Sequence, residues 1–251
     1  MDLERSVQVC NTPIDDEGFF QAYAHMPRSR AGLAAAGEWG QLRPLFPQVA
    51  GKAVLDLGCG YGWHCQYAVQ MGAATVVGID ASQKMLSEAR RQNPHPNIQY
   101  AVCQLEDYAY PPDTFDLVLS NLVLHYIADL DWIYGRVYST LKQGGCFLFN
   151  IEHPVFTAGV NQDWVQNQAG QRLHWPVDNY FYPGPRETRF LGCQVVKQHH
   201  TLTQILNGLL AGGFVLQAVE EVMPPAAWLD DPDMADEMRR PMMLLVKAAK
   251  P

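Results

Sequence analysis

Three glycines at alternating positions follow a short apolar segment and carry the most specific chemical signal in the sequence. The segment Ala53–Leu57 leads into Gly58, Gly60 and Gly62, and a helical pattern begins at Trp63. Glycine permits a positive φ and lets a ligand come close to the backbone, and the start of a helix presents unpaired N–H groups. A strand, a glycine loop and a helix in this order predict a nucleotide-type binding crevice at the carboxyl end of a parallel sheet.

Two carboxylates beside this loop narrow the choice of ligand. Asp56 stands two residues before the first glycine, where a negative charge is unfavourable beside phosphates but favourable beside an ammonium group. Asp80 ends the next strand, 22 residues after Gly58, where a carboxylate accepts both hydroxyls of a ribose. The dinucleotide fingerprint requires glycine or alanine where this chain has Trp63, and no Walker A tripeptide occurs in the sequence. The joint pattern disfavours a dinucleotide and favours a nucleoside ligand that carries an ammonium group.

At these residues the sequence resembles the class I S-adenosylmethionine-dependent methyltransferases of the small-molecule, type 11-like kind, closely over residues 51–151. The run Asp80-x-Ser82-x-x-Met85-Leu86 matches the family's pattern after the second strand, and Phe115-Asp116-Leu117-Val118 matches the opening of the fourth. The resemblance implies that S-adenosylmethionine is the cofactor, that S-adenosylhomocysteine is its product, and that methyl transfer is the reaction. It also implies a structural role for Asp116.

The same resemblance implies which residues bind the cofactor. The glycine loop would cradle the methionine part, Asp80 would hold the ribose, and Met85 would pack on the adenine. Where the family often has aspartate and alanine, this chain has Gln104-Leu105, and the glutamine can accept from the adenine amino group. Tyr23 and Arg28 of the N-terminal region would touch the methionine carboxylate, although plain packing is an open alternative for both. The implied cofactor-binding residues are Asp56, Gly58, Cys59, Gly60, Gly62, Asp80, Ala81, Met85, Gln104, Leu105, Glu106, Asn121, Tyr23 and Arg28.

The elements that must position these residues alternate between strands and helices. Near-continuous apolar strands that alternate with helices indicate a parallel sheet covered on both faces. Together with the resemblance, this predicts an α/β fold with a Rossmann-like, doubly wound sheet of seven strands, mostly parallel, with an antiparallel last strand and an insertion after the fifth strand. The predicted strands are Ala53–Leu57, Thr75–Asp80, Ile98–Cys103, Phe115–Asn121, Cys146–Ile151, Phe214–Val222 and Met242–Lys247, and the first predicted helices are Trp63–Met71, Ser82–Arg91 and Trp132–Leu141.

The sequence divides into four stretches. Residues 1–50 form a helical lead-in or cap, 51–151 the cofactor-binding core, 152–200 an insertion, and 201–251 the remainder of the core sheet. The insertion is rich in aromatic residues and alternates from Thr188 to Lys197 like a strand or hairpin. Because it follows the fifth strand at the carboxyl edge of the sheet, we expect it to form a lid over the methyl acceptor.

Two histidines at strand ends are candidate catalytic residues. His125 follows the fourth predicted strand and His153 the fifth. Methyl transfer requires a general base only when the acceptor atom still carries its proton, so a structural hydrogen-bonding role stays open for either histidine. Further along, Thr201-x-x-Gln204 predicts a capping box at the start of a helix. Arg239-Arg240 follows an acidic run, which predicts a solvated, salt-bridged segment.

Composition excludes several classes of function. The 251 residues include 26 acidic and 18 basic side chains, which give a formal net charge of −8 and argue against nucleic acid as a partner. No apolar run reaches the roughly 20 residues that a membrane helix needs. Residues 1–6 lack the features of a secretory signal, so we expect a cytoplasmic protein. The six cysteines are scattered without a paired spacing, so we expect them to be small, buried apolar side chains and we expect no metal site.

These observations predict an S-adenosylmethionine-dependent methyltransferase that acts on an unidentified small organic acceptor by in-line transfer, in an oligomeric state left open. A non-catalytic cofactor-binding partner subunit is an alternative, and an NAD-type dehydrogenase is disfavoured by Trp63. Because a carboxylate at the open end of a sheet does not hold the core together, we expect the loss of Asp80 to weaken cofactor binding by at least about tenfold and to affect folding little.

Overall fold

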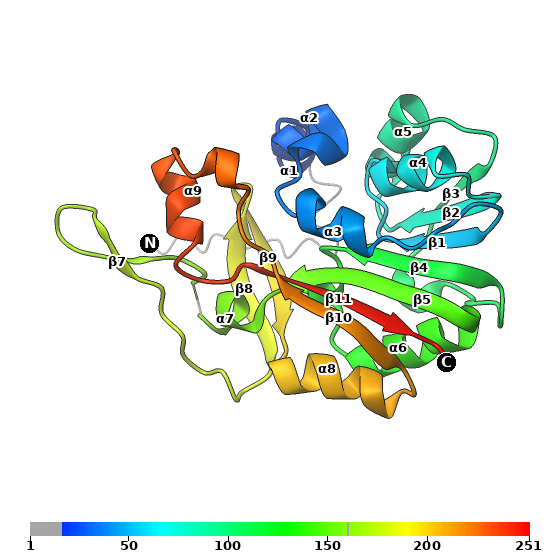
Figure 1. Cartoon of the computed structure of the whole chain (residues 1–251). Coiled ribbons are helices and arrows are strands. Elements are labelled where there is room, and N and C mark those ends of the chain that lie inside the picture. The colour runs from blue at the N-terminus through cyan, green and yellow to red at the C-terminus, as the bar shows by residue number, and fades with distance from the viewer. Residues whose placement is uncertain (1–16, 160) are drawn as a thin grey trace, which may run out of the picture.

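A central seven-stranded sheet organises the protein, as a computed structural model that describes residues 17–159 and 161–251 shows (Figure 1). The first sixteen residues of the predicted lead-in lie outside the described residues. They include Cys10 and the residues on which the prediction about a secretory signal rests. The strand order is β10-β11-β5-β4-β1-β2-β3. The strands are β1 (Ala53–Leu57), β2 (Thr75–Asp80), β3 (Ile98–Val102), β4 (Phe115–Asn121), β5 (Leu141–Glu152), β10 (Val215–Glu221) and β11 (Met243–Ala249).

The direction of the strands confirms the predicted fold class. β1 pairs in parallel with β2 and β4, as do β2 with β3 and β4 with β5. The last strand, β11, lies between β5 and β10 and is antiparallel to both. The carboxyl ends of β1 to β5 therefore meet at one edge of the sheet, which is where a doubly wound fold binds its ligand.

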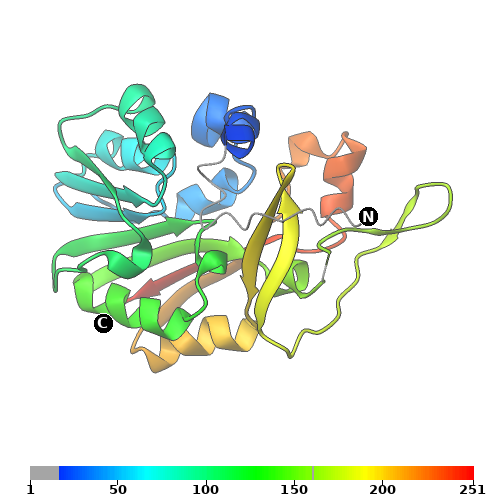
Figure 2. The same cartoon turned by 180° about the vertical axis from the view of Figure 1, so that it is seen from behind.

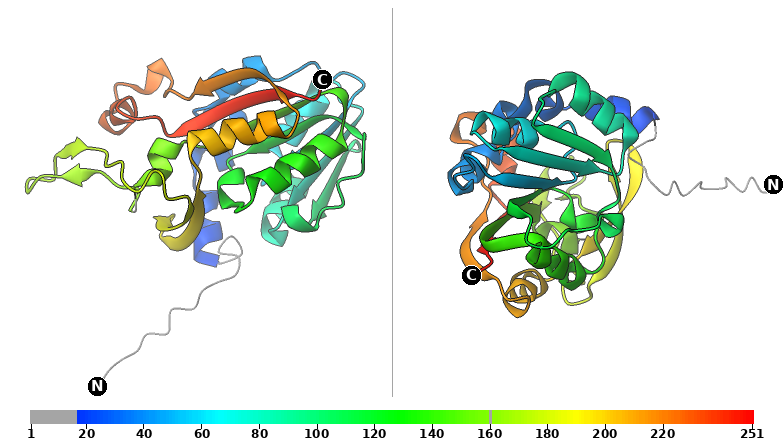
Figure 3. Two further views of the ribbon diagram at one scale, coloured as in Figure 1. Left: turned by 90° about the horizontal axis from the view of Figure 1, so that it is seen from below. Right: turned by 90° about the vertical axis from the view of Figure 1, so that its right-hand side faces the viewer.

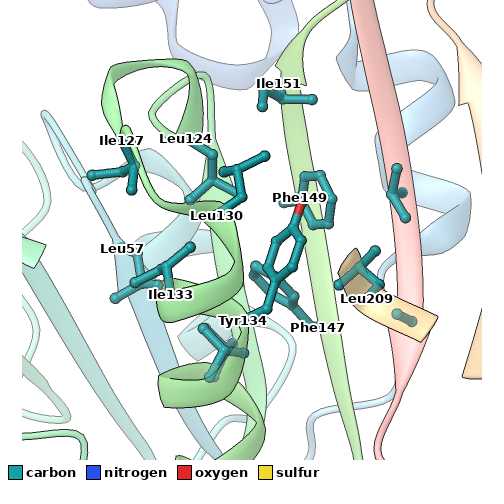
Figure 4. Close-up of a cluster of buried hydrophobic side chains, with 14 of the residues drawn as sticks. Leu57, Leu124, Ile127, Leu130, Ile133, Tyr134, Phe147, Phe149, Ile151 and Leu209 are labelled. Atoms are coloured by element: carbon teal, nitrogen blue, oxygen red, sulfur yellow. The ribbon is translucent and has the colours of Figure 1, made fainter. Parts of the chain in front are cut away.

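Helices cover both faces of the sheet, which explains why its strands are continuous apolar runs (Figure 3). One face packs against α3 (Trp39–Leu45), α4 (Trp63–Gln70) and α5 (Gln83–Gln92), and the other against α6 (Leu130–Thr140) and α8 (Leu202–Ala211). In β1, Val54 belongs to the first of these two cores, whereas Leu55 and Leu57 belong to the second. Figure 4 shows the second core, in which Tyr134 of α6 lies against Phe147 and Phe149 of β5, with Leu209 of α8 beside them.

Several shorter elements stand at the carboxyl edge of the sheet. The lead-in contributes α1 (Glu17–Ala24), α2 (Pro27–Ala31) and the 3-10 turn η2 (Gly32–Ala35). The predicted alternation within the insertion is a hairpin, β8 (Gly184–Phe190) paired with β9 (Cys193–His199). A second hairpin, β6 (Val165–Gln166) with β7 (Arg172–His174), extends away from the rest of the protein (Figure 2). The remaining elements are η3 (Leu105–Asp107), η4 (Leu124–Tyr126), α7 (Pro154–Ala158), η5 (Ala226–Trp228) and α9 (Pro232–Glu237).

Local chemistry accounts for the boundaries that differ from the predicted ones. α6 begins two residues early because the Asp129 side chain caps it, accepting from the Trp132 N–H at 2.9 Å. β5 begins at Leu141 rather than Cys146, since Leu141 already pairs with Phe115 before an irregularity in the ladder. The capping box of Thr201 and Gln204 is present as predicted. Within the described ranges, no helix is long and apolar enough to cross a membrane.

Candidate active site

A cavity of about 1330 Å³ opens at the carboxyl edge of the parallel strands. Each of four strands contributes lining residues at or just after its end: Gly58 after β1, Asp80 in β2, Asn121 in β4 and Glu152 in β5. The lead-in, the β8–β9 hairpin and the segment 222–243 line the remaining sides. Ligand pockets usually have volumes of roughly 300–1,000 Å³, so this cavity has room for a nucleoside and a second small molecule.

The glycine loop after β1 has the backbone that only glycine adopts readily. Gly58, Gly60 and Gly62 have φ values of 73°, 52° and 75°. A Cβ at Gly58 would collide with the Val123 side chain, and one at Gly62 with the Tyr100 ring, so these two glycines serve the fold. A Cβ at Gly60 would project toward the cavity, with the Tyr23 hydroxyl at 3.6 Å. Gly60 is therefore the position at which a ligand can approach the backbone.

Asp80 connects the end of β2 with the glycine loop. Its Oδ2 accepts from the Gly60 N–H at 2.9 Å, and its Oδ1 accepts from the Ser82 N–H at 2.9 Å. The side chain also lines the cavity, beside Ala81. Asp80 thus shapes the loop in addition to facing the ligand space, and these two hydrogen bonds are a reason to expect that its loss affects folding as well as binding.

Asp56 at the end of β1 and Gly62 at the end of the glycine loop are buried and do not line the cavity. The Asp56 side chain is 1% exposed, and its Oδ2 accepts from the Cys65 thiol at 3.3 Å. Burial raises the pKa of Asp56 to about 7. Because Asp56 is not among the described residues that line the cavity, the geometry does not support the predicted contact between this carboxylate and a ligand ammonium group.

The residues expected at the adenine gather along the β2–β3 side of the cavity. Met85 lies in the first turn of α5, whose N-cap Ser82 accepts from the Met85 N–H at 3.1 Å. The buried Met85 side chain packs in a small apolar cluster with Phe19 and Tyr61. Gln104, the other residue expected at the adenine, also lines the cavity, as do the expected cofactor-binding residues Cys59, Leu105 and Glu106.

Tyr23 and Arg28 also line the cavity, together with a carboxylate that the sequence did not single out. Arg28 Nη2 contacts both carboxylate oxygens of Glu38 at 2.5 Å, and Asn121 Nδ2 donates to Glu38 Oε1 at 3.0 Å. Burial alone would raise the pKa of Glu38, but the Arg28 charge and hydrogen bonds from the backbone and Asn121 hold it below its ordinary value. The ligand carboxylate that is predicted to contact Arg28 would therefore join the existing ion pair between Arg28 and Glu38.

The two candidate catalytic histidines have different surroundings. His125 lines the cavity and is 3% exposed, with its Nε2 3.9 Å from Glu152 Oε1. His153 lies outside the cavity lining: its Nδ1 accepts from the Val155 N–H and caps α7, while its Nε2 faces Glu221 Oε1 at 3.1 Å. Because both ring nitrogens of His153 are directed to these structural partners, the geometry does not support the predicted catalytic role of His153.

An ion pair that sequence analysis missed completes the cavity wall beside His125. Lys197 of β9 lies with its Nζ 2.5 Å from Glu152 Oε1, and both side chains are buried and line the cavity. Burial lowers the pKa of His125 to about 4, partly offset by the Glu152 charge, so the imidazole is uncharged at neutral pH. The alternation of β9 was the available signal for Lys197, since it places Val195, Lys197 and His199 on the buried face.

Comparison with known proteins agrees with this geometry. A family model described as a methyltransferase domain matches residues 55–149, the stretch from β1 to β5. A solved structure described as an S-adenosylmethionine-dependent methyltransferase from Listeria monocytogenes is 50% identical, covers 88% of this chain and 99% of its own, and has a TM-score of 0.84. Another, from Mesorhizobium loti, is 42% identical, covers 87% of this chain and 100% of its own, and has a TM-score of 0.80.

The likeness extends over nearly the whole chain and is not confined to the sheet core. An uncharacterised protein from Haemophilus influenzae is 28% identical over 247 residues, which is 94% of this chain and 96% of that protein. The glycine loop, the carboxylate at the end of β2 and the strand order agree with the fold and cofactor of the two similar solved structures. The chain therefore belongs to the class I S-adenosylmethionine-dependent methyltransferases.

Proposed function

We propose that the protein transfers the methyl group of S-adenosylmethionine to a small organic acceptor that binds in the same cavity. The observation that carries the proposal is the cavity itself: the glycine loop and Asp80 line one part, and His125, Glu152 and Lys197 line another. The two parts lie at the ends of different strands, with β4 between β1 and β5. A cofactor and an acceptor can thus bind side by side.

The residues present fit the cofactor. Gly60 leaves space that a Cβ would fill, which supports a ligand lying against the loop. Asp80 would hold the ribose, Met85 and Gln104 would flank the adenine, and Tyr23 with the Arg28–Glu38 pair would meet the amino-acid end. When bound, S-adenosylmethionine supplies a sulfonium methyl group, whose bond to sulfur breaks with the electron pair staying on sulfur.

The protein's own contribution is to align the acceptor and exclude water, since in-line transfer depends mainly on proximity and orientation. The lead-in forms one wall through Phe19 and Tyr23, and the β8–β9 hairpin forms another through Phe190 and Val195. We propose that these two segments act as the cap and the lid, and that the β6–β7 hairpin, which does not line the cavity, has no part in holding the acceptor.

A small acceptor suits the charge of the site better than nucleic acid does. Among the described residues that line the cavity, the cations Arg28 and Lys197 are both engaged by buried carboxylates. The chain as a whole carries a formal charge of −8. Phosphate backbones are bound by clusters of unpaired lysine and arginine, so the acceptor proposed here is a molecule without a polyanionic backbone.

Radiolabelled methyl transfer to fractionated cell extract tests the proposal. We expect label from methyl-tritiated S-adenosylmethionine in the small-molecule fraction, and calorimetry should show binding of S-adenosylhomocysteine but not of NAD. Label confined to the RNA, DNA or protein fractions would contradict the small acceptor. Binding of NAD without binding of S-adenosylhomocysteine would contradict the cofactor assignment as well.

A further inference from the structure

The buried pair of Glu152 and Lys197 stands on the cavity wall two strands away from the glycine loop. Glu152 ends β5, and β4 separates β5 from β1, which leads into the loop. Lys197 Nζ lies 2.5 Å from Glu152 Oε1 and between the rings of Phe190 and Phe156, at 5.2 and 5.9 Å from their centroids. The Glu152 side chain is 9% exposed. The pair is thus a largely buried feature of the cavity wall, away from the glycine loop.

Two acceptor atoms beside this pair are unsatisfied. Among residues 17–159 and 161–251, Glu152 Oε2 and His125 Nδ1 are buried and have no hydrogen-bond partner. Both residues line the cavity, and His125 Nε2 lies 3.9 Å from Glu152 Oε1. A carboxylate near Nε2 favours the tautomer that carries its proton there, which leaves a lone pair on Nδ1. Because buried polar atoms normally have partners, these two atoms indicate a ligand that donates hydrogen bonds.

The charges around the two atoms indicate that the donor is uncharged. Lys197 neutralises Glu152, and His125 is itself uncharged because burial lowers its pKa. The other titratable groups close to His125 are Tyr126 and His200, and burial keeps the neutral form of each favoured as well. The site therefore presents lone pairs without a net charge. An alcohol or phenol satisfies this pattern, whereas an acceptor carboxylate or phosphate would meet the lone pairs of Glu152.

We propose that Glu152 and His125 form the acceptor subsite and that the methyl acceptor is an uncharged alcohol or phenol. The inference rests on the proposed function. The acceptor hydroxyl donates to the subsite, and its proton passes to His125 Nδ1 as the O–H electron pair stays on oxygen. That oxygen forms the new bond to the methyl carbon. Glu152 then faces the imidazolium that results, while Lys197 is a positioning residue that keeps Glu152 in place.

Ligand-observed NMR on the protein loaded with S-adenosylhomocysteine tests the subsite without requiring turnover. The probes are matched pairs: phenol and anisole, 2-naphthol and 2-methoxynaphthalene, and cyclohexanol and cyclohexyl methyl ether. We expect the hydroxyl member of a pair to bind about tenfold more tightly than its ether, the effect of a hydrogen bond to a charged group. Cyclohexylamine, which is cationic at neutral pH, should bind more weakly than cyclohexanol.

Three variants locate the preference. Glu152→Gln and His125→Phe should each reduce the hydroxyl preference severalfold. Glu187→Gln should retain it, because Glu187 also lines the cavity but is exposed on β8. In the wild type labelled with ¹⁵N-histidine, 2-naphthol should shift the Nδ1 signal of His125, identified by its loss in His125→Phe.

The results that would overturn the proposal are equally definite. The first is a wild type that binds neither the hydroxyl nor the ether member of any pair, or binds both equally well. The second is a hydroxyl preference that stays unchanged in both Glu152→Gln and His125→Phe. The third is tighter binding of cyclohexylamine than of cyclohexanol. The wild-type measurements decide the matter even where a subsite variant fails to fold. Calorimetry with S-adenosylhomocysteine separates the two levels: normal cofactor binding without hydroxyl preference overturns the subsite alone, and absent cofactor binding overturns the proposed function.

Discussion

At the residue scale, Asp80 combines two tasks that sequence reasoning had kept apart. Its two carboxylate oxygens accept from the backbone N–H groups of Gly60 and Ser82, so they fix the position of the glycine loop relative to β2. The same side chain borders the cavity. Removal of the carboxylate therefore leaves the Gly60 and Ser82 N–H groups without this partner. It also removes a hydrogen-bond acceptor from the cavity wall.

Asp80→Ala should lower both the affinity for S-adenosylhomocysteine and the melting temperature. Hydrogen bonds to charged groups contribute about 1.5–3 kcal/mol each, so we expect at least about a tenfold loss of affinity. Calorimetry measures the affinity, and a thermal melt measures the stability. An Asp80→Ala protein that binds S-adenosylhomocysteine like the wild type would contradict the assigned role.

Asp116 provides the matched control, because it holds structure outside the cavity lining. Its Oδ2 accepts from the Ala53 N–H at 2.9 Å and from Lys142 Nζ at 2.8 Å, which ties the start of β4 to the start of β1 and to β5. Asp116→Ala should therefore lower the melting temperature while the folded fraction binds S-adenosylhomocysteine normally. A large loss of affinity in this variant would show that loop position and core stability cannot be separated.

At the scale of elements, a buried arginine joins the β6–β7 hairpin to the segment around α9. The Arg240 guanidinium lies 4.2 Å from the centroid of the Trp175 ring and 4.7 Å from that of Phe156, and it pairs with Glu237 at 2.7 Å. The predicted salt bridges of this segment are confirmed, but the predicted solvation is wrong for Arg240, which is only 8% exposed. The aromatic residues of the insertion bury it, and they lie far away in the sequence.

Arg240→Gln should loosen this junction. A desolvated cation–π contact contributes about 2 kcal/mol, so amide hydrogen exchange should become faster in residues 164–176 while the core strands keep their protection. Arg91→Gln is the control, because Arg91 forms an exposed pair with Glu88 on α5 and contacts no aromatic ring of the insertion. Unchanged exchange in residues 164–176 of the Arg240 variant would show that other contacts hold the hairpin.

The elements also show where prediction from sequence reaches its limit. The strands and the glycine loop were predictable because their signals are local: apolar runs, glycines and a carboxylate at fixed spacing. Glu38 was not predictable, because it reaches the cavity from the lead-in and no local pattern encodes that placement. For Lys197 the alternation of β9 indicates a buried face, but not that this face meets the end of β5. At the end of β5, the geometry gives no support to the catalytic role predicted for His153, because α7 begins at Pro154 and His153 caps it, its Nδ1 accepting from the Val155 N–H.

At the scale of the whole molecule, two buried histidines make stability depend on pH. Burial lowers the pKa of both His64 and His125 to about 4. A depressed pKa in the folded state means that the stabilisation is present above the unfolded value of roughly 6.5 and is lost as the pH falls toward 4. Each histidine contributes about 3 kcal/mol to this loss, a sizeable part of the roughly 5–15 kcal/mol that stabilises a domain.

The melting temperature should therefore fall between pH 6.5 and pH 4, and less steeply in His64→Gln and in His125→Gln than in the wild type. Asp56 works in the opposite direction, since its raised pKa of about 7 means that its contribution grows as the pH falls. Asp56→Asn should accordingly steepen the acid branch of the curve. Melts recorded over this range for the three variants check the assignment. Parallel curves for the wild type and both histidine variants would show that neither histidine is the titrating group.

The position of β11 has a consequence for how the chain acquires its fold during translation. β11 is the last of the seven strands to leave the ribosome, yet it lies between β5 and β10 in the finished sheet. Until it emerges, β5 is an open edge and β10 has no neighbour to join, so the nascent chain exposes unpaired backbone groups that invite pairing with other chains. A chain that ends shortly before Met243 therefore carries the complete glycine loop but lacks the strand that joins β10 to β5.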